Sequence, residues 1–329
     1  MRKLRWGVLS TAKIGIDAVI PAIQMCSNGE VVAIASRNLT KAEAAAAGLG
    51  IATAYGSYEE LLDDPEVEAV YNPLPNHLHV PWSIRALEAG KHVLCEKPIA
   101  MNAKEAVELI QATRRHPSLK GMEAFMYRSH PRWRAIRGLL GDGGIGDLTT
   151  IHSIFTYYNV NPEDYRNVPE YGGGGLLDIG CYSISSSRWL FGDEPKRVFG
   201  IVDYDPTFKI DRLASAILDF GVGTATFTCG TQVPRYQRED IYGTRGRIMI
   251  EDPFNPPLDE PARAWLHTVD ETRELISAAA NQYTLMGEAF GEAALSGTDV
   301  PTPLEDALAN MRVIDAVLKS GRTGKWVEL

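Results

Sequence analysis

Cysteine is scarce in this chain of 329 residues. The four cysteines are Cys26, Cys95, Cys181 and Cys229. They show no CxxC spacing, so the sequence predicts neither a zinc cage nor a disulfide framework, and a reducing compartment is expected. Because Lys13 and Asp17 interrupt the apolar stretch near the N-terminus, we expect no signal peptide and a cytoplasmic location.

The sequence also lacks long apolar runs and an excess of positive charge. No stretch approaches the roughly 18 apolar residues of a membrane span. The chain has 33 Lys and Arg against 42 Asp and Glu, and this formal net charge of −9 provides no basic field for nucleic acid or an anionic membrane. With 45% hydrophobic residues, the chain is expected to fold as two globular domains that act on a small molecule.

Two patterns divide the chain near residue 122. Before it, short apolar runs such as "LRWGVLS" and "VVAIASR" alternate with amphipathic segments, which is typical of a parallel sheet with crossover helices. After it, longer runs such as "LTTIHSIFTYYNV" predict an open, mainly antiparallel sheet, mostly over residues 148–275. Helices are expected near 132–140 and 176–191, and a last helix, about 303–320, should pack back on the body. We expect a homodimer, or a tetramer made from dimers, through an exposed apolar sheet face.

The stretch "WGVLSTAKIG" has the order of a dinucleotide-binding turn, namely a strand, small residues and a helix. Ser10, Ala12 and Gly15 occupy the three fingerprint glycine positions, and the two replacements are small enough for pyrophosphate to approach the helix N-terminus. An ordinary strand-to-helix turn is the alternative reading of this stretch alone. The expected cofactor contacts are Ser10, Thr11, Ala12, Lys13 and Ile14.

The end of the second strand indicates which dinucleotide binds. Ser36 and Arg37 stand where NAD-specific folds keep a carboxylate for the ribose hydroxyls. A hydroxyl and a guanidinium suit a 2′-phosphate, and Lys41 adds charge one helical turn later. A solvated arginine at a strand end is the alternative. Together with the turn, this pattern favours NADP, with NAD as the weaker cofactor.

The segment "NPLPNHLH" follows the next strand. His77 and His79 resemble a metal site, but no third ligand at suitable spacing accompanies them, so no metal is predicted. In a Rossmann domain this loop faces the cofactor. The residues expected to do so are Pro73, Leu74, Asn76 and His79.

Two further motifs contain residues that could take part in catalysis. "HVLCEKPIA" ends an apolar strand with Glu96 and Lys97, and Pro98 prevents its continuation, so this pair should reach the crevice at the carboxyl ends of the strands. "YGGGGLLDIGCY" leads into a helix on which Asp178 and Tyr182, four residues apart, share one face. The alternative for the second motif is a glycine loop before an ordinary buried helix.

With these motifs in register, the whole chain resembles the Gfo/Idh/MocA oxidoreductase family. The elements most specific to the resemblance are "CEKP" and "GGGGLLDIGCY". Tyr182 stands where many relatives have a histidine, which is the variant of the branch that contains glucose-fructose oxidoreductase, dimeric dihydrodiol dehydrogenase and NADP-dependent xylose dehydrogenase-like enzymes. The resemblance implies an N-terminal dinucleotide-binding Rossmann domain, residues 1–122, and a C-terminal α+β domain for substrate binding and oligomerisation, residues 123–329.

The resemblance also implies that Lys97 and Tyr182 act together. Oxidation of an alcohol needs a base for the hydroxyl proton while hydride leaves carbon. A tyrosine with a pKa of about 10 is a poor base at neutral pH, and a neighbouring ammonium favours its phenolate. Glu96 would orient Lys97 and, with it, contact the cofactor ribose. The residues expected to bind substrate, besides Lys97 and Tyr182, are Asp178, Phe125, Arg128, Asp164 and Arg166.

Some of these roles have alternatives. Asp178 is expected either to accept substrate hydroxyls or to pair with a local arginine. Asn167 and His130 are further candidates for the pocket by position. The expected activity is NADP-dependent oxidation of an aldose at C1 to the lactone. The alternatives are reduction of a keto sugar, whose linked nucleotide diphosphate Arg235 and Arg238 would bind, oxidation of a trans-dihydrodiol, and a non-catalytic NADP sensor.

Overall fold

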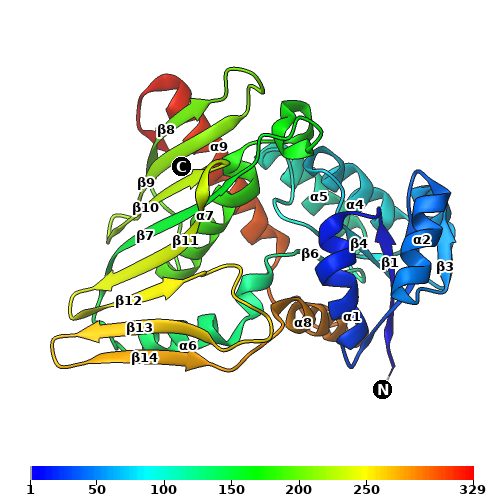
Figure 1. Cartoon of the computed structure of the whole chain (residues 1–329), viewed down its shortest axis with the longest axis horizontal. Helices are drawn as coiled ribbons and strands as arrows, with labels where there is room; N and C mark the ends of the chain where they lie inside the picture. The colour runs from blue at the N-terminus through cyan, green and yellow to red at the C-terminus, as the bar shows by residue number, and fades with distance from the viewer. Residues whose placement is uncertain (1) are drawn as a thin grey trace. The chain divides into compact units, whose positions relative to one another are not determined.

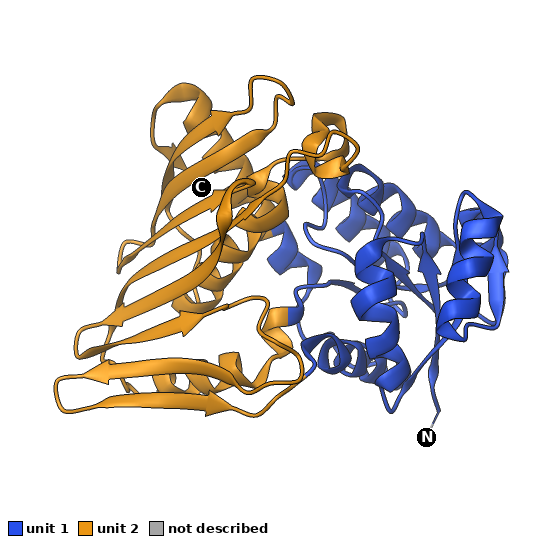
Figure 2. Ribbon diagram, viewed as in Figure 1, with its two compact units in different colours: residues 1–126, 281–308 blue, residues 127–280, 309–329 orange. Residues whose placement is uncertain are grey.

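A computed structural model describes residues 2–329, which form two compact units, one comprising the chain up to 126 and 281–308, the other 127–280 and 309–329 (Figure 2). This division differs from the predicted boundary after residue 122, chiefly because segment 281–308 returns to the first unit. Its helix α8 (Gln282–Ser296) packs on α1 (Ile20–Met25). The Cys26 thiol donates to the Thr284 carbonyl oxygen at 3.3 Å. The Asn28 side-chain amide donates to the backbone carbonyl oxygen of Glu288 at 2.9 Å.

The first unit contains the predicted parallel sheet, in the strand order β3-β2-β1-β4-β5-β6 (Figure 1). Its strands are β1 (Leu4–Leu9), β2 (Gly29–Ala35), β3 (Thr53–Tyr55), β4 (Ala69–Asn72), β5 (His92–Cys95) and β6 (Gly121–Glu123). The apolar runs are buried, which is the physical reason they were recognisable. The sequence did not predict the edge strands β3 and β6, since three residues are too few to show a pattern.

Short capping signals begin and end the helices of this unit. Ser57 Oγ accepts a hydrogen bond from the Glu60 amide at 3.2 Å, as the motif predicts, and Gly50, with φ of +68°, ends α2. The helical segments are a π-helical turn (Gly15–Val19) leading into α1, α2 (Leu39–Leu49), α3 (Tyr58–Asp63), a 3-10 turn (Asn76–Leu78), α4 (His79–Glu88), α5 (Ala103–Arg115) and α8.

The second unit is built on a nine-stranded sheet in the order β14-β13-β12-β11-β7-β10-β9-β8-β15. Its strands are β7 (Leu148–Tyr158), β8 (Arg197–Tyr204), β9 (Asp211–Asp219), β10 (Thr224–Gly230), β11 (Gln232–Gly243), β12 (Gly246–Glu251), β13 (Ala262–Thr268), β14 (Thr272–Ser277) and β15 (Val327–Glu328). Pairing is antiparallel except between β7 and β10. The predicted large, mainly antiparallel sheet is therefore confirmed.

Helices cover one face of this sheet. They are α6 (Pro131–Gly141), α7 (Cys181–Phe191), which follows a π-helical turn (Leu176–Gly180), and α9 (Leu304–Thr323); 3-10 turns cover Met126–Ser129, Tyr165–Asn167 and Pro169–Tyr171. α9 packs so closely on β8 that a Cβ at Gly200 would lie 2.9 Å from the Val317 backbone oxygen. Strand residues on this side, such as Ala216 and Leu218, are buried.

The other sheet face is open within one chain, but it is not uniformly apolar as predicted. Ile201 and Ile217 are exposed on β8 and β9, whereas the central strands β7 and β10 present Thr150 and Thr224 near their beginnings, with the two hydroxyls 3.2 Å apart. Alternation along each strand explains this mixture, because every second residue faces outward whatever its polarity. Within residues 2–329, no helix has both the length and the apolar character to cross a membrane.

Candidate active site

The parallel sheet of the first unit brings the predicted cofactor loops to one edge. β1, β2, β4 and β5 run in the same direction, so the loops that follow them all leave the carboxyl edge of the sheet. This is the edge at which open α/β sheets bind ligands. Segments 10–14, 36–41, 73–79 and 96–98 therefore belong to one surface.

The turn after β1 has the geometry that a pyrophosphate needs. Ser10 has φ of +75°, the left-handed conformation for which the fingerprint normally uses glycine, and its Oγ accepts a hydrogen bond from the Ala12 amide at 3.2 Å. Thr11, Ala12 and Ile14 are partly exposed, and Lys13 pairs with Asp17 one turn into the helix. Small side chains and a helix N-terminus at this point fit a phosphate group.

The loop after β2 presents two cations to solvent. Ser36 is buried and its Oγ accepts from the Asn38 amide at 3.2 Å, while the side chains of Arg37 and Lys41 are exposed. Asn38, which the sequence reasoning overlooked, caps α2 by accepting from the Lys41 amide at 3.2 Å. The loop thus offers positive charge where a 2′-phosphate would lie.

His79 lies between two carbonyl oxygens of the protein. It is buried, and its ring nitrogens lie 2.7 Å from the Pro98 carbonyl oxygen and 2.6 Å from that of Leu74. Burial lowers the pKa of His79 to about 4, and the contacts with the Pro98 and Leu74 carbonyl oxygens oppose this change. Both ring nitrogens face carbonyl oxygens of the protein, one in each of the loops that follow β4 and β5, and the cofactor contact expected for His79 stays a prediction. Pro73, Leu74 and Asn76 in the same loop are also buried.

The Glu96-Lys97-Pro98 turn is held from several sides. The Tyr71 hydroxyl donates to Glu96 Oε1 at 2.7 Å, and the Ile99 amide donates to Glu123 Oε1 at 2.7 Å. The Lys97–Pro98 peptide bond is cis. Burial and the nearby Glu96 raise the pKa of Tyr71 well above its ordinary value, so Tyr71 remains a hydrogen-bond donor. The backbone that carries Lys97 is therefore fixed in position.

A second tyrosine lies close to this turn. Burial raises the pKa of Tyr283 to about 12, with Glu96 also raising it and Lys97 opposing the change. Tyr283 comes from α8, the helix that rejoins the first unit, and nothing in the local sequence of "CEKP" points to it. It was missed because the sequence analysis expected no helix in this segment.

Tyr182 lies in the second unit, in a cluster of aromatic rings. Its ring centroid is 5.1 Å from that of Phe254, 5.7 Å from that of Phe155 and 6.0 Å from that of Tyr127. Its side chain is buried. Phe254 comes from the loop after β12, and no sequence signal connects it with "DIGCY".

Asp178, one helical turn before Tyr182, is engaged by two side chains. Its Oδ2 accepts hydrogen bonds from the Tyr157 hydroxyl at 2.7 Å and from Arg166 Nε at 3.0 Å. This is the arginine partnership that the sequence left open as the alternative to substrate binding. Burial is the main cause that raises the pKa of Tyr157, and the negative charge of Asp178 raises it further. Asp178 also raises the pKa of Arg166, so both donors keep their protons.

Arg166 is the most accessible member of this group, which also includes Asp164. Its side chain is 33% exposed, lies over the Tyr165 ring at 4.6 Å and is 3.5 Å from Asp164 Oδ1. Asn167 is buried beneath the same loop, where its amide donates to the Asn161 carbonyl oxygen at 2.8 Å. Arg166 and Asp164 therefore have the exposure that a substrate contact requires.

Three other candidates have structural roles. Arg128 donates to Ser185 Oγ at 2.8 Å and lies over the Trp189 ring at 5.5 Å, so it braces α7. His130 is fully buried and caps α6, its Nδ1 accepting from the Arg132 amide at 3.1 Å. Phe125 is 4% exposed and packs in the core of the first unit. Contact of these residues with substrate stays a prediction, since they were chosen for their position in the chain.

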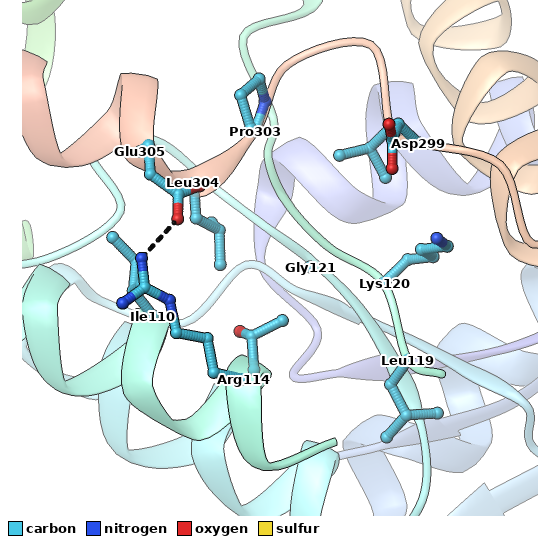
Figure 3. Close-up of a pocket in the computed structure, with 11 residues that line it drawn as sticks. Ile110, Arg114, Leu119, Lys120, Gly121, Asp299, Pro303, Leu304 and Glu305 are labelled. Carbon is cyan, nitrogen blue, oxygen red and sulfur yellow. Dashed lines mark hydrogen bonds and ion pairs between the residues drawn. The ribbon is translucent and has the colours of Figure 1, made fainter. Parts of the chain in front are cut away.

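A cavity of about 380 Å³ lies elsewhere in the first unit, between α5 and the loop before α9 (Figure 3). Arg114 and Glu305 form an ion pair of 3.1 Å at its rim, and Gly121 lines it at the beginning of β6. The beginning of a parallel strand is at the edge opposite the cofactor loops, so this cavity does not belong to the candidate active site.

Comparisons with known proteins identify the family of the chain. Residues 4–122 match the oxidoreductase family described as having an NAD-binding Rossmann fold, and residues 133–249 match the GFO/IDH/MocA C-terminal domain. The chain is 45% identical to the uncharacterized oxidoreductase ORF334 of Rhizobium meliloti, over 99% of both chains. It is 36% identical to D-xylose 1-dehydrogenase (NADP(+)) 2 of Haloferax volcanii, over 99% of this chain and 100% of the relative.

A solved structure is similar over nearly the whole chain. It is that of KijD10, a 3-ketoreductase from Actinomadura kijaniata in complex with NADP and TDP-benzene, with a TM-score of 0.92 and 31% identity over 97% of this chain and 98% of KijD10. The chain belongs to the GFO/IDH/MocA oxidoreductase family, as its motifs predict, and is a nicotinamide-dependent dehydrogenase or reductase of the sugar-oxidoreductase kind. The predicted dinucleotide cofactor is confirmed. The Haloferax xylose dehydrogenase is named as an NADP(+) enzyme, and KijD10 was solved in complex with NADP.

Proposed function

We propose that this oxidoreductase uses NADP to oxidise an aldose at C1 to the lactone, with Tyr182 as the acid/base group and Lys97 as its partner. The observation that carries the proposal is the fixed Glu96-Lys97-Pro98 turn at the carboxyl edge of the parallel sheet, held by Tyr71 and Glu123. The name of the Haloferax relative, a xylose 1-dehydrogenase, supports C1 as the reacting carbon.

The residues that would hold NADP are those of the loops at this edge. The turn of segment 10–14 would bind the pyrophosphate, and Ser36, Arg37 and Lys41 would bind the 2′-phosphate, because an exposed guanidinium and ammonium attract a dianionic group. The nicotinamide supplies the hydride acceptor when bound. Glu96 would orient Lys97 toward the ribose.

The protein's own groups would handle the proton. Tyr182, as phenolate, would take the proton of the C1 hydroxyl while hydride leaves C1, so that carbon loses two electrons and the hydroxyl becomes a carbonyl. The Lys97 ammonium favours the phenolate and stabilises negative charge on the substrate oxygen. In the reverse reaction Tyr182 would return the proton to the alkoxide.

The charge of the Asp164, Arg166 and Asp178 group favours a neutral polyhydroxyl substrate. Two carboxyl groups surround one guanidinium, so the formal charge of the group is one negative unit. Hydroxyl groups donate well to such a site, whereas a nucleotide diphosphate would be repelled. The charge of this group therefore favours a sugar that is not linked to a nucleotide diphosphate.

A second candidate is reduction of a nucleotide-linked keto sugar, which the similarity to the 3-ketoreductase KijD10 favours. It needs cations for the diphosphate. Of the two arginines proposed for that role, Arg238 makes two hydrogen bonds to Asp240, at 2.7 and 3.0 Å, which neutralise it, and only Arg235 remains exposed. We therefore rank this candidate second.

The open face of the nine-stranded sheet is proposed to pair with a second copy of the chain. Ile201 is 67% exposed in the middle of β8, and Trp326 and Ile217 are exposed nearby in the same sheet region. A symmetric dimer would cover these side chains. The threonines near the beginnings of β7 and β10 are compatible with a close approach of two sheets.

Two measurements test the function. NADPH formation or consumption is followed with D-xylose, D-glucose, a trans-dihydrodiol and a TDP-linked keto sugar. Tyr182→Phe should bind NADP normally but lower kcat with the best substrate by about 10²–10⁴, the usual contribution of an acid/base group. Lys97→Met should lower kcat comparably, and the double variant should lose far less than the product, since the two residues act as one unit.

The matched control for the acid/base role is Tyr127→Phe. Tyr127 is also buried, its ring packs against Tyr182, and its hydroxyl bonds Ser185 at 2.8 Å. It should retain most of the activity. Comparable losses in the two phenylalanine variants, or full activity of Tyr182→Phe, would assign the proton transfer to another group.

A further inference from the structure

The glycine turn before Tyr182 closes around a buried carboxylate from another part of the chain. Asp211, the first residue of β9, accepts the Leu176 amide proton with Oδ2 at 2.6 Å. Gly174 has φ of +116°, and a Cβ at that position would lie 1.8 Å from Asp211 Oδ1. The turn therefore needs glycine at 174 for two reasons, its backbone conformation and the space that the carboxylate occupies.

Asp211 caps the N-terminus of the helix, although it is distant from that helix in the chain. The helical segment that begins at Leu176 has Gly175 at its N-terminus and receives no capping hydrogen bond from that residue. The Asp211 carboxylate accepts from the Leu176 amide and also from the Gly175 amide. A negative group at this end also suits the helix dipole. A strand of the sheet thereby anchors the start of the helix.

The anchored helix contains Asp178 and Tyr182, the proposed substrate-site and acid/base residues. Asp178 follows Leu176 by two residues, and Tyr182 follows by six, within a continuous run of helical residues. Gly180 lies so close to β10 that a Cβ there would be 2.9 Å from Cys229 Sγ. The position and tilt of this run are thus determined at its N-terminus by Asp211 and in its middle by the Gly180 contact.

We propose that Asp211 is a positioning residue for the reaction, which sets where Asp178 and Tyr182 lie by anchoring the glycine turn and the N-terminus of their helix. The proposal rests on the proposed role of Tyr182 as the acid/base group. Asp211 itself is proposed to contact neither substrate nor cofactor. It acts through the backbone amides of Gly175 and Leu176.

The surroundings of Asp211 make this anchor sensitive to pH. The titratable groups that interact with it include Asp178 from the same turn, Tyr204 on β8 and Cys229 on β10. The nearby cations engage these neighbours, Arg166 pairing with Asp178 and Arg322 with Tyr204. Burial raises the pKa of Asp211 to about 7. As pH rises through this value the neutral acid becomes a carboxylate, which accepts amide hydrogen bonds more strongly. The anchor should therefore tighten between about pH 6 and 8.

The test compares Asp211→Ala and Asp211→Asn with Asp219→Asn. Asp219 is the matched control, because it ends the same strand and its carboxylate also accepts a glycine-turn amide, that of Gly221 at 2.8 Å. Hydrogen exchange of a peptide covering residues 173–186 reports on the turn without any substrate. Steady-state kinetics with D-xylose and NADP, or with the best substrate of the panel, report on the reaction.

We expect Asp211→Ala to accelerate exchange at 175–176 and to lower kcat at least tenfold, with KM for NADP changed less than twofold. Asp211→Asn keeps one acceptor oxygen, so it should restore part of kcat and lose the pH-dependent step near pH 7. Asp219→Asn should match the wild type in both measurements. If Asp211→Ala does not fold, the same comparison is made with Asp211→Asn alone.

Wild-type exchange and kcat in both Asp211 variants would overturn the proposal, as would faster exchange with unchanged kcat and pH profile. An equal effect of Asp219→Asn would also overturn it. Failure of the proposed function gives a different result: Tyr182→Phe would remain active, while the exchange effect of Asp211→Ala would still be confined to the turn.

Discussion

The Tyr71 hydroxyl and Glu96 Oε1 are joined by a hydrogen bond of 2.7 Å at the base of the turn that carries Lys97. Tyr71 is fully buried on β4, and Glu96 follows β5, its neighbour in the sheet. The bond therefore ties the side chain beside the proposed catalytic lysine to the rigid centre of the Rossmann domain. It gives the first prediction.

Tyr71→Phe should reduce both stability and turnover. The variant keeps the ring but leaves Glu96 without its phenolic donor, so the free energy of unfolding should fall by about 1.5–3 kcal/mol, as for a hydrogen bond to a charged group. kcat should fall roughly tenfold as the turn loosens. Urea denaturation and steady-state kinetics measure the two effects. Tyr55→Phe, which removes a 3.0 Å bond to Asp64 in the same domain, should leave kcat unchanged.

Arg37→Ala should weaken NADP much more than NAD. The exposed guanidinium is proposed to face the 2′-phosphate, and its loss should cost about 1.5–3 kcal/mol of NADP binding while NAD binding changes little. Titration calorimetry with both cofactors measures the difference. Arg115→Ala, an exposed arginine on α5, is the control. Equal weakening of both cofactors would remove Arg37 from the specificity site.

Arg166→Met should raise KM for the sugar by about 10- to 100-fold and leave KM for NADP unchanged, since one charge-assisted contact is worth about 1.5–3 kcal/mol. The control is Arg197→Met. Arg197 likewise pairs with a carboxylate, Asp219 at 2.8 Å, and lies over an aromatic ring, Trp326 at 4.7 Å. A sugar KM that is the same in the two variants would show that Arg166 serves only to hold its loop.

Glu239→Gln should flatten the dependence of stability on pH. Glu239 is fully buried, its Oε2 accepts from Ser186 Oγ at 2.8 Å, and burial raises its pKa to about 8. The folded state therefore binds this proton more tightly than the unfolded state, in which the pKa is near 4.5. The stabilisation is complete below about pH 4.5 and is lost as pH rises toward 8.

Urea denaturation at pH 5 and pH 8 measures this effect. The wild type should lose about 2–4 kcal/mol between the two values through Glu239, and Glu239→Gln, which resembles the protonated acid, should lose much less. Glu274→Gln, on the exposed edge strand β14, should behave as the wild type does. An unchanged pH dependence in Glu239→Gln would mean that this carboxyl is ionised in the folded protein.

Ile201→Lys should dissociate the proposed dimer. A lysine in the middle of the open face would place an ammonium between two sheets, and light scattering should show the mass fall toward 36.1 kDa. Val269→Lys, at the highly exposed turn between β13 and β14, should leave the mass unchanged. A monomeric wild type at working concentration would contradict the proposal directly.

The Rossmann sheet and the loops after its strands could be predicted because each is specified by a few consecutive residues. A buried parallel strand is a short apolar run, and the residues after it must emerge at the carboxyl edge, so Ser10, Arg37 and Lys97 could be placed from the sequence alone. The helix caps at Ser57 and Gly50 are equally local, since each is set by the backbone of a few residues. The glycines before Leu176 marked a turn for the same reason.

What that turn encloses was decided only by the tertiary structure. Asp211 is far from Leu176 in the chain, and no periodicity connects the first residue of β9 with a glycine turn. The same holds for Tyr283 beside Glu96, Phe254 against Tyr182, and helix α8, which returns to pack on α1. The burial of His79 between the Leu74 and Pro98 carbonyl oxygens is likewise set by the tertiary structure. A sequence pattern specifies which residues are buried and how the backbone turns, but the partner of a buried polar group depends on which distant segments the packed sheet brings within hydrogen-bonding distance.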